Sequence, residues 1–163
     1  MARNVYFSFH FQRDIQRANV VRNSRMILAD GEEVGYYDRS LWEEAQTKGD
    51  AAIQALIDQG LVGASVTAVL IGAETYERPW VQYEIAASHD QGMGLLGIRL
   101  NNIPGWNNEV EAAGPNPFDH LRIPGPLGGT VLSSLYPVYD WVYDDGYTNA
   151  SAWIEQAALA ANR

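Results

Sequence analysis

A strand–helix–strand pattern over residues 65–101 constrains the fold more than any other part of the sequence. It opens with the apolar run Val66–Ile71, which ends at a glycine and is typical of a strand covered on both faces. A helix is predicted over 79–89, and it begins with a proline. Proline is tolerated at the first position of a helix, because an N–H group there would have no partner within the helix. A second apolar run over 95–100 predicts a returning strand. Strands joined in this way by a helix lie parallel, so we expect a parallel sheet.

Apolar periodicity elsewhere predicts further strands and helices. The strands are expected at 4–11, 34–37 and 138–143, the helices at 14–28, 50–59 and 149–161, and short helical turns around Trp42 and over 132–136. In chain order these elements predict a single doubly wound α/β domain with a five-stranded parallel sheet of flavodoxin-like type. Its central strands are expected to be the runs at 5–9 and 66–71, because their apolar character is unbroken.

Residues 101–137 hold six of the seven prolines and several glycines, so they predict a long irregular connection. In a compact domain such a connection is often a lid or a binding loop. It can equally be an insertion without a chemical role, and the pattern alone leaves both interpretations open.

Composition excludes several classes of function. The chain has no cysteine, which rules out disulfides, thiolate catalysis and zinc–thiolate sites, and its three histidines are too scattered to predict a metal cluster. A net charge of −9 disfavours binding to nucleic acid or to an anionic membrane. No apolar run approaches the roughly 18 residues that span a bilayer. Because residues 1–9 also lack the features of a signal peptide, we expect a cytoplasmic protein.

Glu84 is the charged residue whose position most needs an explanation. On the predicted helix it lies one turn from Trp80, next to the apolar stripe that faces the sheet. One interpretation is a glutamate at the border of the core, paired with Arg78 or Arg99. The other is a carboxylate held beside a cleft, where partial burial can tune it for catalysis. Spacing alone favours the first interpretation.

The helix predicted at 14–28 is basic within an acidic protein. Its arginines, with the one just before it, are Arg13, Arg17, Arg22 and Arg25. They form either a solvated face or a set of contacts to phosphate groups, and the first interpretation is the simpler one.

Two separated stretches resemble a known family. The opening VYFSFHFQRD resembles the first strand of TIR domains, in which a Phe-Ser-Phe/Tyr pattern leads into the first helix. The stretch YERPWVQYEI resembles the TIR pattern Tyr-x-x-Ser-x-Trp-Cys-x-x-Glu-Leu. Trp80, Glu84 and Ile85 lie at its Trp, Glu and Leu, and Tyr76 corresponds to its Tyr, one residue closer to the tryptophan. Together with Arg-Asn-Ser at 22–24, the opening is most similar to the ThsB group of the bacterial Thoeris antiphage system. The resemblance covers residues 4–101, and departs from the pattern at Arg78 and Val81.

The resemblance implies that the chain cleaves NAD, which is then a substrate, with no cofactor. It implies that Glu84 is catalytic, because a fixed carboxylate stabilises the oxocarbenium-like ribose formed when the nicotinamide bond breaks. It also implies that the ADP-ribose is kept as a cyclic isomer. This isomer would act as a diffusible signal in antiphage defence by activating a separate effector protein. A homo-oligomer is possible for such a protein.

Supporting roles in NAD binding are expected at the carboxyl ends of the strands and on aromatic residues nearby. Phe9 and His10 would flank the nicotinamide or ribose, Trp42 would stack on a ring, and Asn101 would bind a ribose hydroxyl. With Trp80 they complete the predicted substrate site. Each also has a structural interpretation: a packed strand end for Phe9 and His10, core packing for Trp42, and a turn cap for Asn101.

Two other classes of function stay open. One is a TIR-like module without catalysis, whose only output is assembly. The other is an enzyme similar to the nucleoside deoxyribosyltransferases, which also cleave N-glycosidic bonds with a glutamate on a related fold.

Overall fold

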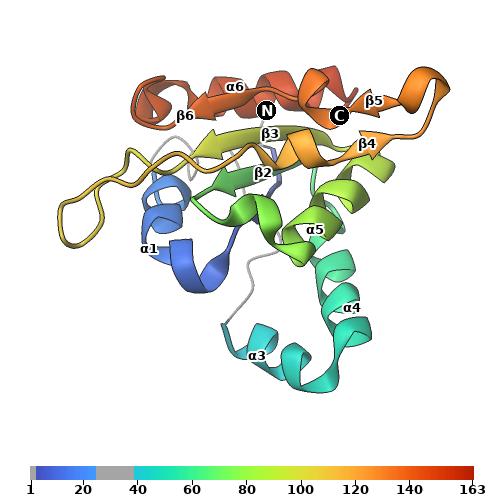
Figure 1. The fold of residues 1–163 in the computed structure, drawn as a ribbon, viewed down its shortest axis with the longest axis horizontal. Helices are drawn as coiled ribbons and strands as arrows, with labels where there is room; N and C mark the ends of the chain where they lie inside the picture. Colours follow the sequence, from blue (N-terminus) through green and yellow to red (C-terminus); the bar gives the residue numbers. More distant parts are fainter. Residues whose placement is uncertain (1–2, 25–38) are drawn as a thin grey trace.

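The computed structural model describes residues 3–24 and 39–163, and a parallel sheet forms its centre (Figure 1). Four described strands pair in the order β1-β2-β3-β6, and all neighbours are parallel. They are β1 (Val5–Ser8), β2 (Val66–Ile71), β3 (Gly94–Arg99) and β6 (Val138–Asp140). Helix α5 (Pro79–Asp90) joins β2 to β3, which confirms the predicted strand–helix–strand unit.

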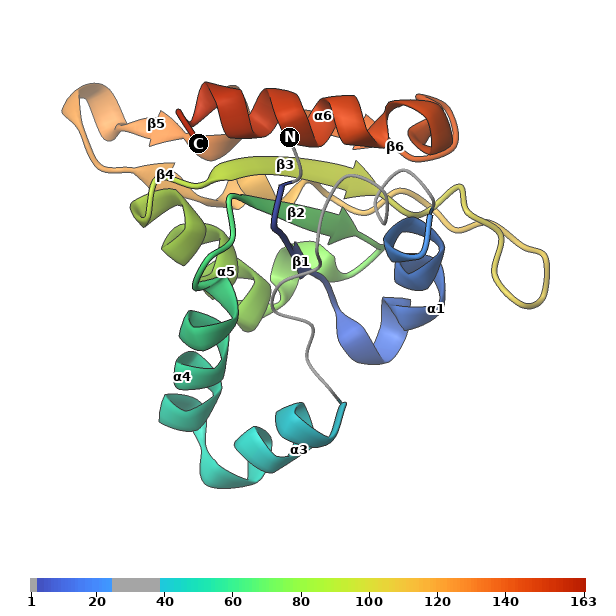
Figure 2. The same ribbon diagram turned by 180° about the vertical axis from the view of Figure 1, so that it is seen from behind.

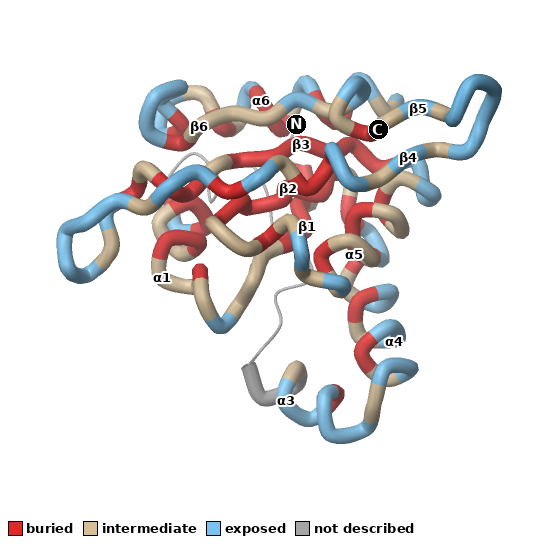
Figure 3. The backbone as a smooth tube through the Cα atoms, viewed as in Figure 1, coloured by how far each residue is buried: buried red, intermediate tan, exposed pale blue. Residues whose placement is uncertain are grey.

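Helices cover both faces of the sheet, as Figures 1 and 2 show from opposite sides. Apolar residues of α1 (Phe11–Arg22) and α6 (Gly146–Ala160) pack on one face with alternate residues of β2, Val66, Ala68 and Leu70. On the other face Val69 and Ile71 pack with α5. Helices α3 (Arg39–Lys48) and α4 (Asp50–Leu61) extend this second layer and pack around Tyr6 of β1. β1, β2 and β3 are therefore buried between two helical layers (Figure 3), whereas β6 is half-buried.

The segment over 101–137 packs against the sheet beside α5. It contains a two-stranded antiparallel ribbon and short 3₁₀ turns, namely η2 (Pro117–His120), β4 (Arg122–Ile123), η3 (Pro126–Gly128), β5 (Thr130–Val131) and η4 (Leu132–Ser134). Phe118 and Leu132 are fully buried in the cluster that contains Ile71 of β2 and Ile85 of α5. This segment therefore completes the hydrophobic core, and the helical turn expected over 132–136 is present as η4.

The strand expected at 34–37 lies outside the described residues, so the fifth strand stays a prediction. The central place expected for the strand at 5–9 also stays a prediction. In the described sheet β1 is the last strand at one side, although all four of its residues are buried. The central place of β2, parallel to both its neighbours, is confirmed.

The predicted bounds of the first strand and helix were wrong. The strand ends at Ser8, and helix α1 runs from Phe11 to Arg22 instead of 14–28. The helix starts early because the His10 carbonyl accepts the N–H of Asp14. The aromatic residues at 9–11 resemble strand residues in sequence, but residues 9 and 10 form the connection to α1 and Phe11 begins the helix, so β-propensity is outweighed here.

The last strand and helix were also misplaced at their junction. β6 ends at Asp140 and not at 143, because its carboxylate accepts the N–H groups of Val142 and Tyr143 and turns the chain. Helix α6 then begins at Gly146, three residues before the predicted start at 149. The local hydrogen bonds of one aspartate therefore decide where the strand stops.

Candidate functional site

A buried carboxylate lies against a cavity at the carboxyl end of β1. Glu84 of α5 is only 4% exposed, and it lines a cavity of about 190 Å³. The other lining residues come from the junction of β1 with α1, from α3 and from the start of α5: Phe7, Phe9, His10, Phe11, Gln12, Trp42, Gln46, Arg78, Pro79, Trp80 and Val81. Five of the six predicted site residues are therefore in one place, namely Phe9, His10, Trp42, Trp80 and Glu84.

The fold brings these segments together because parallel strands end at the same edge of the sheet. The chain leaves β1 at Ser8 and passes through Phe9 and His10 before α1 begins. β2 ends at the same edge, and after the turn η1 (Thr75–Glu77) the chain enters α5 at Pro79. Glu84 and Trp80 are one helical turn apart, so both side chains face the cavity.

Burial changes the acidity of Glu84. Removal from solvent raises the pKa of its carboxyl to about 8, although the nearby hydroxyls of Ser8 and Tyr6 lower it. Among the described residues, its Oε2 atom has no hydrogen-bond partner. Burial therefore favours the protonated carboxyl at neutral pH, and a cationic ligand beside it would favour the carboxylate.

The predicted ion-pair partners of Glu84 are engaged elsewhere. Arg78 pairs with Glu74 at 3.3 Å, and Arg99 donates a hydrogen bond to the carbonyl of Gly114. The interpretation of Glu84 as a border residue paired with an arginine was therefore wrong. Glu84 is buried, and the two arginines bind other groups.

His10 adds a polar group to the cavity. Burial lowers its pKa, and the positive charge of Arg78 lowers it further, so the ring is neutral at pH 7. Within the described part of the chain, its buried Nδ1 has no hydrogen-bond partner. A neutral imidazole with a free nitrogen is suited to hydrogen bonding with a bound ligand.

Trp42 lines both this cavity and a second one. This second cavity has a volume of about 290 Å³ and is lined by Phe11, Gln12, Ile15, Trp42, Glu43 and Gln46, from α1 and α3. Four residues, Phe11, Gln12, Trp42 and Gln46, line both cavities. The two cavities therefore form neighbouring compartments that share an aromatic wall.

Asn101 is the one predicted site residue that does not line the cavity. It is buried in the turn after β3, where its carbonyl accepts the N–H of Glu111. β3 is two strands away from β1, so the carboxyl end of β3 lies beside a different part of the edge. The side-chain Oδ1 of Asn101 has no hydrogen-bond partner among the described residues, so the turn cap and the ribose contact both stay predictions.

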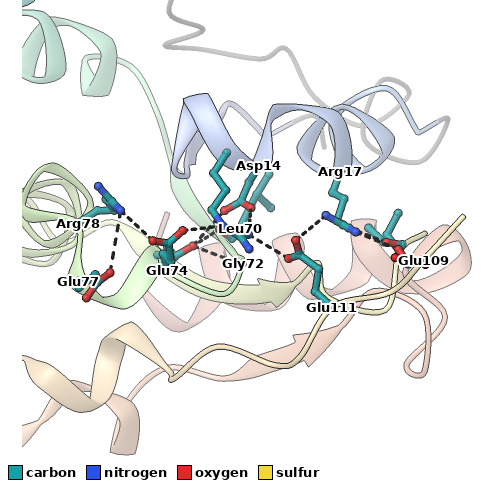
Figure 4. A network of polar contacts seen from close by, with 12 residues as sticks. Asp14, Arg17, Leu70, Gly72, Glu74, Glu77, Arg78, Glu109 and Glu111 are labelled. Carbon is teal, nitrogen blue, oxygen red and sulfur yellow. Dashed lines mark hydrogen bonds and ion pairs between the residues drawn. The ribbon is translucent and has the colours of Figure 1, made fainter. Parts of the chain in front are cut away.

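A network of ion pairs lies between the carboxyl ends of the strands (Figure 4). Arg13 contacts Asp14 at 3.1 Å, Glu74 at 2.6 Å and Glu111 at 3.0 Å. Arg17 contacts Glu111 at 3.1 Å and donates to the carbonyls of Ile103 and Glu109. These two arginines therefore form neither a solvated face nor a free phosphate site. Arg25 lies outside the described residues.

Asp14 is the buried centre of this network. It is 1% exposed, and burial raises its pKa while Arg13 lowers it. A Cβ atom at Gly72 would lie 2.2 Å from Asp14 Oδ2, so only glycine lets the end of β2 approach α1 this closely.

Sequence reasoning missed Gln12, Gln46 and Arg78 as cavity residues. For Arg78 a signal existed, because it immediately precedes the proline that begins α5, at the carboxyl edge of the sheet. The glutamines carry no such signal, because their place depends on how α1 and α3 approach each other.

Two further properties bear on function. No group of at least three histidine, aspartate or glutamate residues in the described ranges 3–24 and 39–163 is arranged to hold a metal ion. In the same ranges, none of the helices has the length and apolar character needed to cross a membrane.

Comparison with known proteins identifies the family. Residues 6–104 match the family model described as Thoeris protein ThsB, TIR-like domain. The chain is also 38% identical over 191 aligned residues to a protein of Bacillus cereus (strain MSX-D12) with the provisional name cyclic ADP-D-ribose synthase ThsB1. That alignment covers 94% of this chain and all of the relative. On this evidence, and with a parallel sheet flanked by helices, the chain belongs to the ThsB family of Thoeris TIR-like proteins.

Proposed function

We propose that this protein cleaves NAD at the bond between nicotinamide and ribose and releases the ADP-ribose part as a cyclic isomer. The observation that carries the proposal is Glu84, a buried carboxyl in a cavity walled by aromatic side chains. The name of the Bacillus cereus relative, a cyclic ADP-D-ribose synthase, supports the same reaction.

The proposed chemistry uses the change in charge during bond cleavage. NAD carries a positive charge on its pyridinium ring, and this charge beside Glu84 favours the carboxylate over the carboxylic acid. When the C1′–N bond breaks, its electron pair goes to the nicotinamide, which leaves neutral. The positive charge then lies on the ribose, where the carboxylate stabilises it. No strong acid is needed for departure of the leaving group.

The fate of the ribosyl cation depends on what reaches C1′ first. Capture by water gives linear ADP-ribose, whereas capture by a nitrogen or hydroxyl of the adenosine in the same molecule gives a cyclic product. The second route needs a folded-back substrate and a site that keeps water out. The cavity that shares Trp42 with the catalytic one is a place for the adenosine end, and its aromatic wall suits a stacked base.

The proposal has consequences for partners. A cyclic product is diffusible, so the partner is a separate effector protein reached through this product in antiphage defence. NAD is the substrate, and no cofactor takes part. The cytoplasm, where NAD is present, is the proposed location.

Replacement of Glu84 by glutamine tests the proposal. The change keeps the size of the side chain but removes the charge, so NAD turnover should fall by roughly 100-fold or more. The matched control is Asp90→Asn, which removes an exposed carboxylate from the end of the same helix. It should turn over NAD like the unchanged protein. Circular dichroism and thermal unfolding should show that both variants are folded.

Mass spectrometry of the products separates the remaining classes of function. The cyclic product is one water lighter than ADP-ribose. If linear ADP-ribose is the sole product, the protein is a simple NAD hydrolase. If NAD is not cleaved at all, a module that acts by assembly is favoured. Cleavage of a deoxynucleoside, but not of NAD, would favour the deoxyribosyltransferase-like class.

A further inference from the structure

Arg78 is a cationic residue of the catalytic cavity that the proposed chemistry does not use. It is the residue immediately before α5, and it lines the cavity together with His10, Trp80 and Glu84. Its side chain is 38% exposed, whereas Glu84 is almost completely buried. Glu84 therefore lies at the floor of the cavity and Arg78 at its mouth.

The hydrogen-bonding capacity of Arg78 is only partly used. One nitrogen, Nη2, contacts Glu74 at 3.3 Å and Glu77 at 4.0 Å, and both carboxylates are substantially exposed. Ion pairs of this kind contribute little to stability. Its Nε atom is buried and has no hydrogen-bond partner among the described residues. Arg13, in contrast, contacts three carboxylates at 3.1 Å or less.

The positive charge of Arg78 distinguishes it from the other residues of the cavity. Arg78 is the one cationic side chain among the described residues that line the cavity, since His10 is neutral there. The whole chain has a net charge of −9 and repels anions on average. Among the described residues that line the cavity, Arg78 is therefore the source of attraction for an anionic ligand.

We propose that Arg78 binds the diphosphate of the substrate, an inference that rests on the proposed function. In a dinucleotide the diphosphate is attached to the 5′ oxygen of the ribose that carries the nicotinamide. With C1′ at the floor beside Glu84, the diphosphate lies towards the mouth. Arg78 and Glu84 are six residues apart, about 9 Å along the axis of the helix. The planar guanidinium presents several N–H donors to phosphate oxygens, and Nε is one that no described residue uses.

Two ligands separate a phosphate-binding role from a structural one. ADP-ribose contains the diphosphate, whereas nicotinamide riboside contains the nicotinamide and its ribose but no phosphate. Binding of both can be measured by titration calorimetry, which does not require turnover. The variants are Arg78→Gln, which removes the charge, and Arg78→Lys, which keeps the charge but loses the fork of donors. Arg122→Gln is the control, because Arg122 is an exposed arginine that lines neither cavity near Glu84.

Arg78→Gln should weaken ADP-ribose binding by about 10- to 100-fold, the scale of hydrogen bonds to a charged group. Its affinity for nicotinamide riboside should stay within about twofold of that of the unchanged protein. The affinity of Arg78→Lys for ADP-ribose should lie between those of Arg78→Gln and the unchanged protein. Arg122→Gln should bind both ligands like the unchanged protein. Unchanged ADP-ribose binding by Arg78→Gln, or equal weakening of both ligands, would overturn the role of Arg78. If the unchanged protein binds neither ligand, the proposed NAD site itself fails, which is a different result.

Discussion

At the scale of single residues, the acidity of Glu84 should control the reaction. Burial raises its pKa to about 8 in the protein without substrate, and kcat/KM reports the pKa values of the free enzyme. We therefore expect kcat/KM for NAD to rise about tenfold per pH unit below pH 8 and to level off above it. Initial rates between pH 6 and 9.5 would measure this. A flat profile for the unchanged protein would contradict a role for the carboxylate.

The same pKa predicts a pH dependence of stability, which needs no activity. Because the folded state holds the Glu84 proton more tightly than the unfolded state, this contribution is complete below the unfolded pKa of about 4.3. It is lost as pH rises to about 8. Glu84→Gln has no such dependence, so its melting temperature should exceed that of the unchanged protein by an amount that grows with pH across this window.

At the scale of elements, helix α3 places Trp42 between two cavities. If the second cavity holds the adenosine, Trp42→Ala should let water compete for the ribosyl cation and raise the ratio of linear to cyclic product several-fold. Trp42→Phe should change the ratio less, because it keeps an aromatic face. Chromatography of the products at low conversion measures this ratio.

The control for this prediction is Trp106→Ala. Trp106 is 92% exposed and lines neither of these cavities. It should leave the product ratio unchanged. A Trp42→Ala variant that loses rate without any change in product ratio would show that α3 does not position the adenosine.

At the scale of the whole molecule, Arg13 joins three separate segments. It links α1 to the turn after β2 through Glu74, and to the segment after β3 through Glu111. Arg13→Gln leaves Asp14 buried without its nearest cation, so we expect a loss of about 2 kcal/mol. For a chain of this size that lowers the melting temperature by roughly 4–8 °C.

Lys48→Gln is the matched control for this prediction. It removes an exposed ion pair between Lys48 and Glu44, one turn apart on α3. Such pairs contribute about 0.3–0.5 kcal/mol, so the melting temperature should change by no more than about 2 °C. If the two substitutions lower the melting temperature equally, the network around Asp14 contributes no more to stability than a surface ion pair.

Sequence alone determined the features that depend on local spacing. The parallel strand–helix–strand unit followed from two apolar runs and a proline at a helix start, and the common face of Trp80 and Glu84 followed from the helical repeat. The motifs around Ser8 and Glu84 indicated the family, because they follow each other along the chain in the family's order. These features need no knowledge of distant contacts.

Only the tertiary structure decided how deep Glu84 lies and what surrounds it. Its raised pKa comes from burial in the folded chain, and the two hydroxyls that lower it, those of Tyr6 and Ser8 on β1, are far away in sequence. The place of Arg78 at the cavity mouth and the ion pairs of Arg13 likewise require segments that meet only when the sheet forms. Desolvation and ion pairing depend on distance in space, whereas periodicity depends on distance along the chain. The sequence therefore predicted where the carboxylate lies on the helix, but not how deeply it is buried or which groups surround it.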